Sequence, residues 1–369
     1  MNRLAEKLTQ AWLSRGFLAW CLLPFSALMW TLVKLRRTAY EHGWLQATRL
    51  PVPVIVVGNR IVGGAGKTPV TIAVIQHLQS RGLRPGVLTR GYKARQVEQT
   101  FQLLDDASEC RLHASETGDE PMLIWRKTHV PVMIGRDRAK GGAALLSHHP
   151  EIDVLICDDG LQHLKLQRDI EIVVFDERGQ GNGWLLPAGL LREPIHTKKT
   201  TGVVGKPLIL YNASRPSTPL VGHMAQRRMD RMVKLETWWR DEQVDTPDSH
   251  SAPPRFGERV HAMAGIAQPQ RFFDALKAMG YLVEGLPLPD HADFAELPWT
   301  DEHMDLVVTE KDAVKLEPSR VHRERPMTRV WVAGMSLFPE PAFWLELDQA
   351  MDRLHFRHTA VPLTGTQNN

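Results

Sequence analysis

The sequence predicts an α/β protein with a doubly wound, mostly parallel sheet, a second and smaller α/β domain, and an N-terminal membrane-associated helix. Three observations predict this architecture. A β-branched run at residues 52–57 leads into a glycine-rich loop and then into a stretch with helical spacing. Strand-like and helix-like segments alternate through most of the remaining chain. An uncharged apolar run, residues 17–33, lies near the N-terminus.

Length and composition narrow the class of protein. The chain has 369 residues, of which 43% are hydrophobic, so two domains are expected, and wholesale disorder or a multi-span transporter is disfavoured. Lys+Arg 45 against Asp+Glu 42 leaves a net charge of +3, which gives no sign of a nucleic-acid partner. Cys21, Cys110 and Cys157 are too widely spaced for a disulfide framework or a C-x-x-C metal site. This cysteine usage fits a reducing cytoplasm.

The apolar run at residues 17–33 predicts a membrane-associated helix. As a helix it reaches about 25 Å, slightly less than the roughly 30 Å of a hydrocarbon core, so spanning the bilayer and lying at its surface both remain open. Arg15 precedes the run and the basic segment at residues 34–37 follows it, where cations could reach lipid phosphates. A secretory signal peptide is disfavoured because no small-x-small cleavage site follows. A buried amphipathic helix is the other alternative.

The glycine-rich loop is typical of a nucleotide site. Its core residues are Gly63, Gly64, Ala65, Gly66, Lys67 and Thr68. Between a buried strand and a helix, such a P-loop wraps backbone N–H groups around phosphates, with lysine on the outer phosphates and threonine on Mg²⁺. The strict pattern has glycine where this chain has Ile61, and the variant loop of the partition-type families has lysine where this chain has Val62. A glycine-rich turn that binds no nucleotide is the plainer alternative.

A second buried run, residues 154–157, ends in Asp158 and Asp159. Carboxylates at the carboxyl end of a parallel strand face the ligand crevice, so one of them is placed to steady Mg²⁺. An ordinary Asp-Asp-Gly turn would have the same sequence. Residues 85–89 and 170–175 predict further core strands of the same sheet.

A series of short motifs follows in fixed order along the chain. They are Gly58-Asn59, the P-loop with Pro69, Arg90-Gly91-Tyr92, Gly118-Asp119-Glu120-Pro121, Asp158-Asp159-Gly160-Leu161-Gln162-His163, Gly181-Asn182-Gly183, Leu186-Pro187-Ala188-Gly189, Leu191-Arg192-Glu193-Pro194, Pro289-Asp290-His291 and Thr309-Glu310-Lys311-Asp312-Ala313. Together they make residues 12–350 resemble the tetraacyldisaccharide 4'-kinase family. Leu190 departs from the proline that the family pattern has there.

The resemblance implies transfer of the ATP γ-phosphoryl group to the 4'-hydroxyl of tetraacyldisaccharide 1-phosphate, which gives lipid IVA in lipid A biosynthesis. It implies ATP and Mg²⁺ as cofactors. It also implies that the enzyme acts at the cytoplasmic face of the inner membrane, and it implies no protein partner. An acyl-rich substrate stays in the bilayer, which agrees with a membrane-associated helix, whether peripheral or a single-span anchor.

The resemblance also implies roles for individual residues. Asp119 is implied as the base for the 4'-hydroxyl, with His291 paired to it. The metal site would draw on Thr68, Glu120 and Asp159. Substrate or nucleotide contacts are expected from Asn59, Arg90, Tyr92, Arg138, Gln162 and Arg192. Asp119 read without the family could simply begin a helix at residues 121–125.

The predicted domains are a helix at residues 1–37, a P-loop kinase domain at 38–215, a linker with a hairpin strand at 216–258, a smaller α/β domain at 259–358 and a disordered tail at 359–369. With these boundaries His291 reaches Asp119 only if the two domains face each other. The competing hypothesis is a P-loop nucleotide-dependent switch or metallochaperone-type NTPase. Such a protein should carry a Cys/His cargo site, which three scattered cysteines do not provide.

Overall fold

The computed structural model describes residues 11–91, 101–107, 114–195, 203, 205–240, 253–302 and 305–359. The chain folds into two compact units. Unit 1 comprises Met1–Arg90, Gly135–Gln226 and Leu337–Asn369, and unit 2 comprises Gly91–Ile134 and Arg227–Ser336. The division differs from the predicted boundaries, because residues 91–134 belong with the C-terminal part of the chain.

Unit 1 is built on a sheet whose strand order is β8-β7-β6-β1-β5-β2. The strands are β1 (Val54–Gly58), β2 (Pro85–Thr89), β5 (Val154–Asp158), β6 (Ile170–Asp176), β7 (Leu208–Asn212) and the first residues of β8 (His223–Lys234), which continues into unit 2 from Arg227. Each neighbouring pair in this order is parallel, and Val56 of β1 lies in register with Cys157 on one side and Glu171 on the other. The carboxyl ends of β1, β5, β6 and β7 therefore share one edge of the sheet, where open α/β sheets bind ligands.

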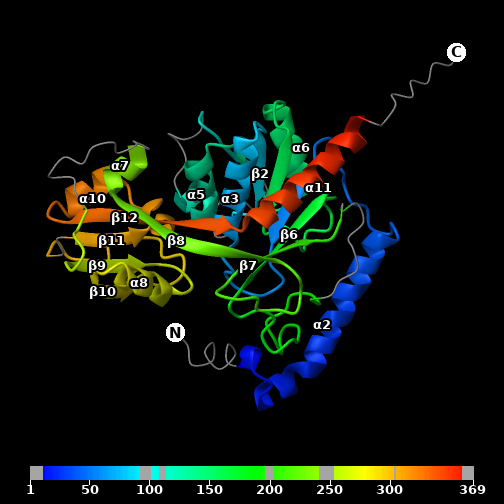
Figure 1. The fold of residues 1–369 in the computed structure, drawn as a ribbon, viewed down its shortest axis with the longest axis horizontal. Coiled ribbons are helices and arrows are strands. Elements are labelled where there is room, and N and C mark those ends of the chain that lie inside the picture. The colour runs from blue at the N-terminus through cyan, green and yellow to red at the C-terminus, as the bar shows by residue number, and fades with distance from the viewer. Residues whose placement is uncertain are drawn as a thin grey trace. The chain divides into compact units, whose positions relative to one another are not determined.

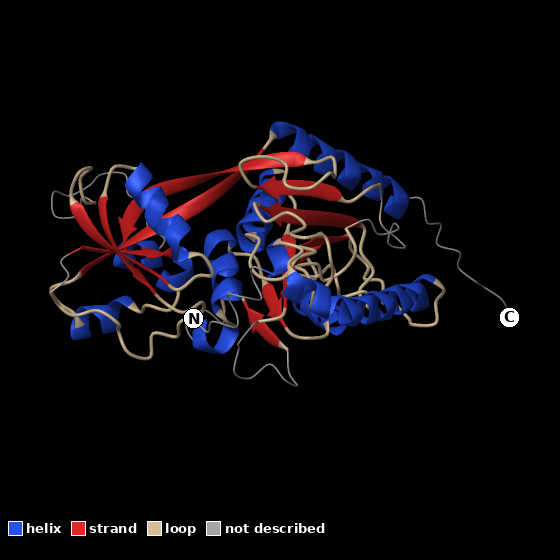
Figure 2. Cartoon of the chain, turned by 90° about the horizontal axis from the view of Figure 1, so that it is seen from below, coloured by secondary structure: helices blue, strands red, loops and turns tan. Residues whose placement is uncertain are grey.

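Helices cover this sheet and complete the doubly wound arrangement (Figures 1 and 2). They are α3 (Lys67–Ser80), α6 (Arg138–His148) and α11 (Pro341–Thr359), whereas α2 (Phe17–Glu41) is bound to the loop around Leu185. Helix α3 packs against β1, β2 and β5, α6 packs against β2, and α11 packs against β7. Strand β1 is buried along its whole length, as its β-branched sequence predicts for a central strand with helices on both faces.

The strands of unit 2 follow the order β10-β9-β11-β12 within the 12-stranded sheet of the chain, and each neighbouring pair in this order is parallel. Its strands are β9 (Arg259–Ala264), β10 (Leu282–Pro287), β11 (Asp305–Thr309) and β12 (Arg329–Pro339), and its helices are α4 (Ala114–Thr117), α5 (Asp119–Thr128), α7 (Leu235–Arg240), α8 (Pro269–Ala278), α9 (Glu310–Ala313) and α10 (Pro318–Glu324). The short strands β3 (Gln102–Leu104) and β4 (Val132–Ile134) form an antiparallel pair. Helix α5 contacts α9, which explains why residues 91–134 belong to this unit.

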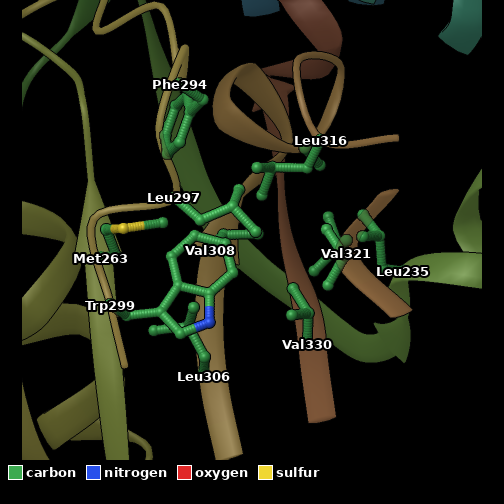
Figure 3. Close-up of a cluster of buried hydrophobic side chains, with 12 residues drawn as sticks. Leu235, Met263, Phe294, Leu297, Trp299, Leu306, Val308, Leu316, Val321 and Val330 are labelled. Atoms are coloured by element: carbon green, nitrogen blue, oxygen red, sulfur yellow. The ribbon is translucent and has the colours of Figure 1, made fainter. Parts of the chain in front are cut away.

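The core of unit 2 lies on both faces of its sheet. Val308 belongs to the cluster around Trp299 and Phe294, which Figure 3 shows, whereas the preceding Val307 belongs to the cluster around Phe272. Successive side chains of a strand point to opposite faces, so β11 is buried on both sides. This packing fixes the carboxyl end of β11, from which α9 begins.

The predicted linker at residues 216–258 is wrong for residues 223–240. Strand β8 runs over His223–Lys234 and pairs in parallel with β7 (Leu210↔His223), and α7 follows it, so this segment is a sheet strand and a helix instead of a linker with a hairpin strand. Only Ala225 and Met232 are buried along β8. The many charged side chains on this strand hide the apolar pattern that a strand normally shows. Residues 241–252 and the predicted tail from residue 360 lie outside the described residues.

Helix α2 is the one described helix that is long and apolar enough to cross a membrane, with a mean hydropathy of 1.6 over its best window. Trp20, Phe25 and Leu28 are among its exposed side chains. Ser26 is buried and anchors the helix to unit 1, since its Oγ donates to Leu185 O at 2.7 Å and accepts from Ala188 N at 2.9 Å. One face of α2 thus binds the protein while large apolar side chains remain in solvent, which is consistent with membrane association.

Candidate active site

The P-loop connects β1 to α3 at the carboxyl edge of the unit 1 sheet. Gly63 and Gly66 adopt left-handed backbone angles, with φ of 85° and 73°, which side chains rarely tolerate. Gly66 is also the N-cap of α3 and has no side-chain capping bond, so the first N–H groups of the helix keep no intrahelical or capping partner. Together with the helix dipole, these N–H groups make a site for an anion.

Side chains hold the loop by its carbonyl oxygens. Asn59 Nδ2 donates to Gly63 O at 3.1 Å, and Asn212 Nδ2 donates to Ala65 O at 3.2 Å. Arg178 donates from Nη1 to Val62 O at 3.1 Å and from Nη2 to Gly64 O at 3.0 Å. These bonds tie back the carbonyls, whose negative ends would repel phosphate. Asn59, a predicted substrate contact, is fully buried and supports the loop instead.

Arg178 and Asn212 are residues that the sequence motifs did not reveal. Asn212 is the last residue of β7 and Arg178 lies two residues beyond the end of β6, so both stand at the same sheet edge as the P-loop. Asp176 holds Arg178 in place, with Oδ2 at 2.9 Å from Nε. Polar residues at the ends of predicted parallel strands were the signal that could have found them.

The departures of the P-loop from the strict pattern have a packing explanation. Ile61 is fully buried and forms an antiparallel bridge with Leu191, and Val62 N donates to Leu190 O at 2.9 Å. Ile61, Ala65, Leu190 and Leu191 form one apolar cluster. A glycine at position 61 or a proline at position 190 would lose part of this packing. Both departures from the expected pattern are therefore explained by the same apolar cluster.

The two aspartates after β5 differ in what they face. Asp158 is buried, and its Oδ1 accepts from Thr71 Oγ1 of α3 at 2.7 Å. Asp159 has a side chain that is 38% exposed, adopts a φ of 48°, and places Oδ1 3.6 Å from Lys67 Nζ. A left-handed angle at a residue other than glycine marks a strained position of the kind found at functional sites. Asp159 is therefore the carboxylate of this pair that lies at the P-loop.

The residues present fit a magnesium ion bound together with phosphates. Thr68 and Asp159 supply hard oxygen donors beside the P-loop, and Mg²⁺ in such sites takes one or two protein oxygens, with phosphates and waters for the rest. Within the part of the chain that the structure describes, no group of three or more His, Cys, Asp or Glu side chains could hold a metal. These ligands thus suit a metal ion that is also coordinated by nucleotide phosphates, and they do not suit a site formed by protein side chains only.

Gln162 and Arg192, both predicted substrate contacts, extend the polar network from Asp159. Arg192 Nη1 lies 3.3 Å from Asp159 Oδ1 and 3.5 Å from Gln162 Oε1. Gln162 Nε2 donates to Asn59 O at 3.2 Å and to Glu193 Oε1 at 3.0 Å. The guanidinium of Arg192 is 28% exposed, so part of it remains available to a ligand.

The other predicted contacts of this group have different surroundings. Arg90 is exposed at the end of β2, while Tyr92 lies outside the described residues. Arg138 is 5% exposed and donates from Nη1 to Gly135 O at 2.9 Å. This burial argues against a direct phosphate contact and assigns Arg138 to the start of α6.

Asp119 and His291 meet in unit 2. Asp119 is the first residue of α5, after Gly118 at a φ of 91°, and is 6% exposed. His291 Nδ1 lies 2.8 Å from Asp119 Oδ2 and 3.0 Å from Oδ1. Both residues belong to unit 2, so the expectation that two domains must face each other for this contact is wrong.

Two lysines from α9 and its C-terminal extension surround the carboxylate. Lys311 Nζ lies 3.9 Å and Lys315 Nζ 3.8 Å from Asp119 Oδ2. Burial alone would raise the pKa of Asp119, but the hydrogen bond from His291 and the charges of Lys311 and Lys315 outweigh it and hold that pKa below its usual range. Asp119 is therefore a carboxylate at neutral pH.

The contacts of His291 fix its tautomer. Lys311 Nζ lies 3.4 Å from His291 Nε2, and an ammonium group has no lone pair to accept a hydrogen bond. The ionised carboxylate of Asp119 can only accept, so Nδ1 carries the proton that His291 donates to it. His291 adopts a φ of 59°, held by its N–H on Gly265 O at 3.0 Å, so a strained backbone orients this ring.

Glu120, a predicted metal ligand, also lies in unit 2. Its Oε1 is 3.4 Å from Lys311 Nζ, and its side chain is 33% exposed. Lys311 reaches Asp290 as well, at 3.8 Å. Burial would lower the pKa of Lys311, yet the charges of Glu120, Asp119 and Asp290 raise it, so this lysine stays charged among three carboxylates.

The chain matches the model of the family described as LpxK, tetraacyldisaccharide-1-P 4'-kinase, over residues 18–352. A tetraacyldisaccharide 4'-kinase of Leptothrix cholodnii is 49% identical, over 92% of this chain and 94% of its own length. One of Methylibium petroleiphilum is 50% identical, over 93% of each. A crystal structure of the apo form of LpxK from Aquifex aeolicus in complex with ATP is 27% identical, with a TM-score of 0.72, and the match covers 92% of this chain and 99% of that one.

Proposed function

The chain belongs to the tetraacyldisaccharide-1-P 4'-kinase family, and from this premise we propose that it transfers the γ-phosphoryl group of ATP to the 4'-hydroxyl of tetraacyldisaccharide 1-phosphate. The product is lipid IVA, an intermediate of lipid A biosynthesis. The observation that carries the proposal is the P-loop with Lys67 beside Asp159, in a chain that matches named kinases over nearly its whole length. A nucleotide switch is not favoured, because family membership supplies an acceptor.

The residues of unit 1 bind and orient the nucleotide in this proposal. Backbone N–H groups at the start of α3 and the ammonium of Lys67 receive the phosphates, and Arg192 adds a second cation beside Asp159. Thr68 and Asp159 would hold Mg²⁺, which supplies charge neutralisation at the β- and γ-phosphates when bound. Phosphoryl transfer needs mainly positioning and charge stabilisation, and these groups provide both.

Asp119 accepts the proton of the 4'-hydroxyl in the proposed reaction. His291 fixes the carboxylate through its Nδ1 proton, and Lys311 and Lys315 keep it ionised. A carboxylate with a lowered pKa is a weak base. The loose transition state of phosphoryl transfer requires only that the proton be received as the new O–P bond forms, so a weak but always ionised base suffices.

Helix α2 supports the proposal that this reaction takes place at the lipid surface. Its exposed aromatic and aliphatic side chains suit the acyl region, and a tetraacylated substrate does not leave the bilayer. We assign the protein to the cytoplasmic face of the inner membrane, where ATP is available.

The test incubates the purified protein with Mg-ATP, detergent and tetraacyldisaccharide 1-phosphate, and identifies the product by mass spectrometry and chromatography. A single added phosphate at the 4'-position is the expected product, and Lys67→Met is the matched inactive control. Absence of this product, together with rapid GTP hydrolysis that needs no lipid, would reject the kinase in favour of the switch.

A further inference from the structure

Helix α2 is connected to the nucleotide site by a continuous chain of polar contacts. The chain begins at Arg37, one turn before the helix ends at Glu41, where Nη1 donates to Glu193 Oε2 at 2.7 Å. Their side chains are 15% and 6% exposed, respectively, so this ion pair is largely withdrawn from water. The family resemblance and the proposed reaction assign no task to Arg37.

Glu193 uses its second oxygen to carry the connection inward. Oε1 accepts from Gln162 Nε2 at 3.0 Å, while Oε2 accepts from Arg37. The backbone around Glu193 is fixed as well, because Arg192 N donates to Arg60 O at 2.8 Å and Arg60 Nη1 donates to Pro194 O at 3.3 Å. Because the backbone around Glu193 is fixed, its carboxylate determines the positions of both side chains that donate to it, Arg37 and Gln162.

Gln162 joins this carboxylate to the residues at the P-loop. Its Oε1 lies 3.5 Å from Arg192 Nη1, and the same nitrogen lies 3.3 Å from Asp159 Oδ1. Asp159 in turn lies 3.6 Å from Lys67 Nζ. Every link from α2 to the lysine of the P-loop belongs to unit 1.

The surroundings make the Arg37–Glu193 pair sensitive to substitution. Arg60 and Arg168 are also buried nearby, and burial lowers the pKa of Arg60 while the charge of Glu193 opposes that shift. Removing Arg37 takes away the cation bonded to Glu193 Oε2, and the buried carboxylate then shifts toward its remaining cations or recruits water. For Glu193, any such movement displaces Gln162.

We propose that Arg37 is a positioning residue for the nucleotide site, through which α2 holds Glu193, Gln162 and the side chains around Asp159 in their binding arrangement. The inference rests on the proposed function only for the identity of the nucleotide. Helix α2 is also the helix with the exposed apolar face. The Arg37–Glu193 contact therefore couples the position of this helix to the affinity of the site for ATP.

The test measures the Kd of Mg-ATP directly, by titration with a fluorescent ATP analogue in detergent, for Arg37→Ala, Arg37→Lys and Arg36→Ala. Arg36 precedes Arg37 on the same helix and is exposed, so its variant removes the same charge away from Glu193. We expect the Kd to rise roughly 3- to 30-fold for Arg37→Ala, the range typical of residues that couple to a site without touching its ligand. Arg37→Lys should recover much of the loss, and Arg36→Ala should stay within about twofold of wild type.

A double-mutant cycle with Glu193→Gln separates positioning from general destabilisation. If Arg37 acts through Glu193, adding Arg37→Ala to Glu193→Gln should raise the Kd little further. Equal Kd values for Arg37→Ala and Arg36→Ala, or fully additive effects in the cycle, would overturn the proposal. If Arg37→Ala does not fold, a Kd of Mg-ATP for Glu193→Gln equal to that of wild type is by itself enough to overturn the proposal.

The assay is independent of the lipid acceptor. A wild-type protein that binds ATP but forms no 4'-phosphorylated lipid would refute the proposed function and leave the test of Arg37 valid.

Discussion

Replacing Asp119 with asparagine tests the chemistry of unit 2 most directly. The two side chains have the same shape, so the amide oxygen of the asparagine can still accept from His291 Nδ1. The change removes the negative charge and the ability to take a proton. We expect ATP to bind as in wild type, because the P-loop and the side chains that hold it belong to unit 1.

For Asp119→Asn, the expected loss of turnover is larger than the expected loss in the free energy of unfolding. A positioned general base contributes typically 10²- to 10⁴-fold, or about 3 to 5 kcal/mol in the barrier, so turnover should fall by that factor. The cost to folding is smaller, about 1–3 kcal/mol. It is limited because Lys315 keeps Asp312 at 3.1 Å and Lys311 keeps Glu120 at 3.4 Å, so neither cation loses all its partners.

The assay compares kcat and KM for Asp119→Asn with those for Asp290→Asn under saturating lipid. Asp290 is a matched control, since it is a carboxylate 3.8 Å from both Lys311 Nζ and His291 Nε2 but its side chain is 42% exposed. Its variant should lose less than about threefold, as expected for a partly solvated ion pair. Equal turnover of the two variants, with both folded, would refute the assignment of Asp119 as the base.

Three other predictions address binding, stability and the membrane. Lys67→Met should raise the Kd of Mg-ATP roughly 10- to 100-fold, because a charge-assisted contact to phosphate contributes about 1.5–3 kcal/mol, and titration calorimetry measures it. The pKa of Asp119 lies below its ordinary value of 3.8 in the folded protein, so its contribution to stability is present above that value and is lost as pH falls through the folded pKa. Denaturant unfolding should therefore show a gap between wild type and Asp119→Asn at pH 7 that narrows below about pH 4; a constant gap would contradict the shift. Trp20→Gln with Leu28→Gln should move protein from the membrane pellet to the supernatant, since each large apolar side chain contributes about 1.5–3 kcal/mol on burial, and ATP binding should not change.

The sheet of unit 1 could be predicted because its strands are buried on both faces. A short continuous apolar run then indicates a strand buried on both faces. Strand β2 (Pro85–Thr89) begins and ends at the residues predicted for it. The P-loop was equally visible, since glycines, lysine and threonine follow β1 at fixed spacing. Strand β11 (Asp305–Thr309) shows the same pattern, because Val307 and Val308 are buried on opposite faces of its sheet.

Strand β8 could not be predicted in the same way. Its residues are mostly exposed or half-buried and carry charges, so hydrogen bonding to its neighbours in the sheet, β12 and β7, decides its structure while the apolar pattern is weak. The assignment of residues 91–134 to unit 2 also depends on packing between α5 and α9, which are far apart in sequence. Periodicity reports local structure and carries no information about such contacts.

The supporting residues of the site escaped prediction for a related reason. Arg178, Asn212 and Lys315 contribute through the carbonyl or carboxylate that they contact, and each partner lies far away in the sequence. A motif marks a residue that meets the ligand, whereas a residue that holds the motif in shape can come from any neighbouring strand or helix. The sequence motifs therefore include Lys67, Asp119 and His291 but omit Arg178, Asn212 and Lys315.

The polar groups of each unit are held in place by residues of that same unit. Asp119, His291, Lys311 and Lys315 all lie in unit 2, and their contacts with one another require no group from unit 1. The loop at residues 63–68 is likewise held by Asn59, Arg178 and Asn212, all within unit 1. The cluster around Asp119 and the P-loop are thus each shaped by the packing of their own unit, so the strain at Asp159 and His291 is met by the fold of the unit that contains it.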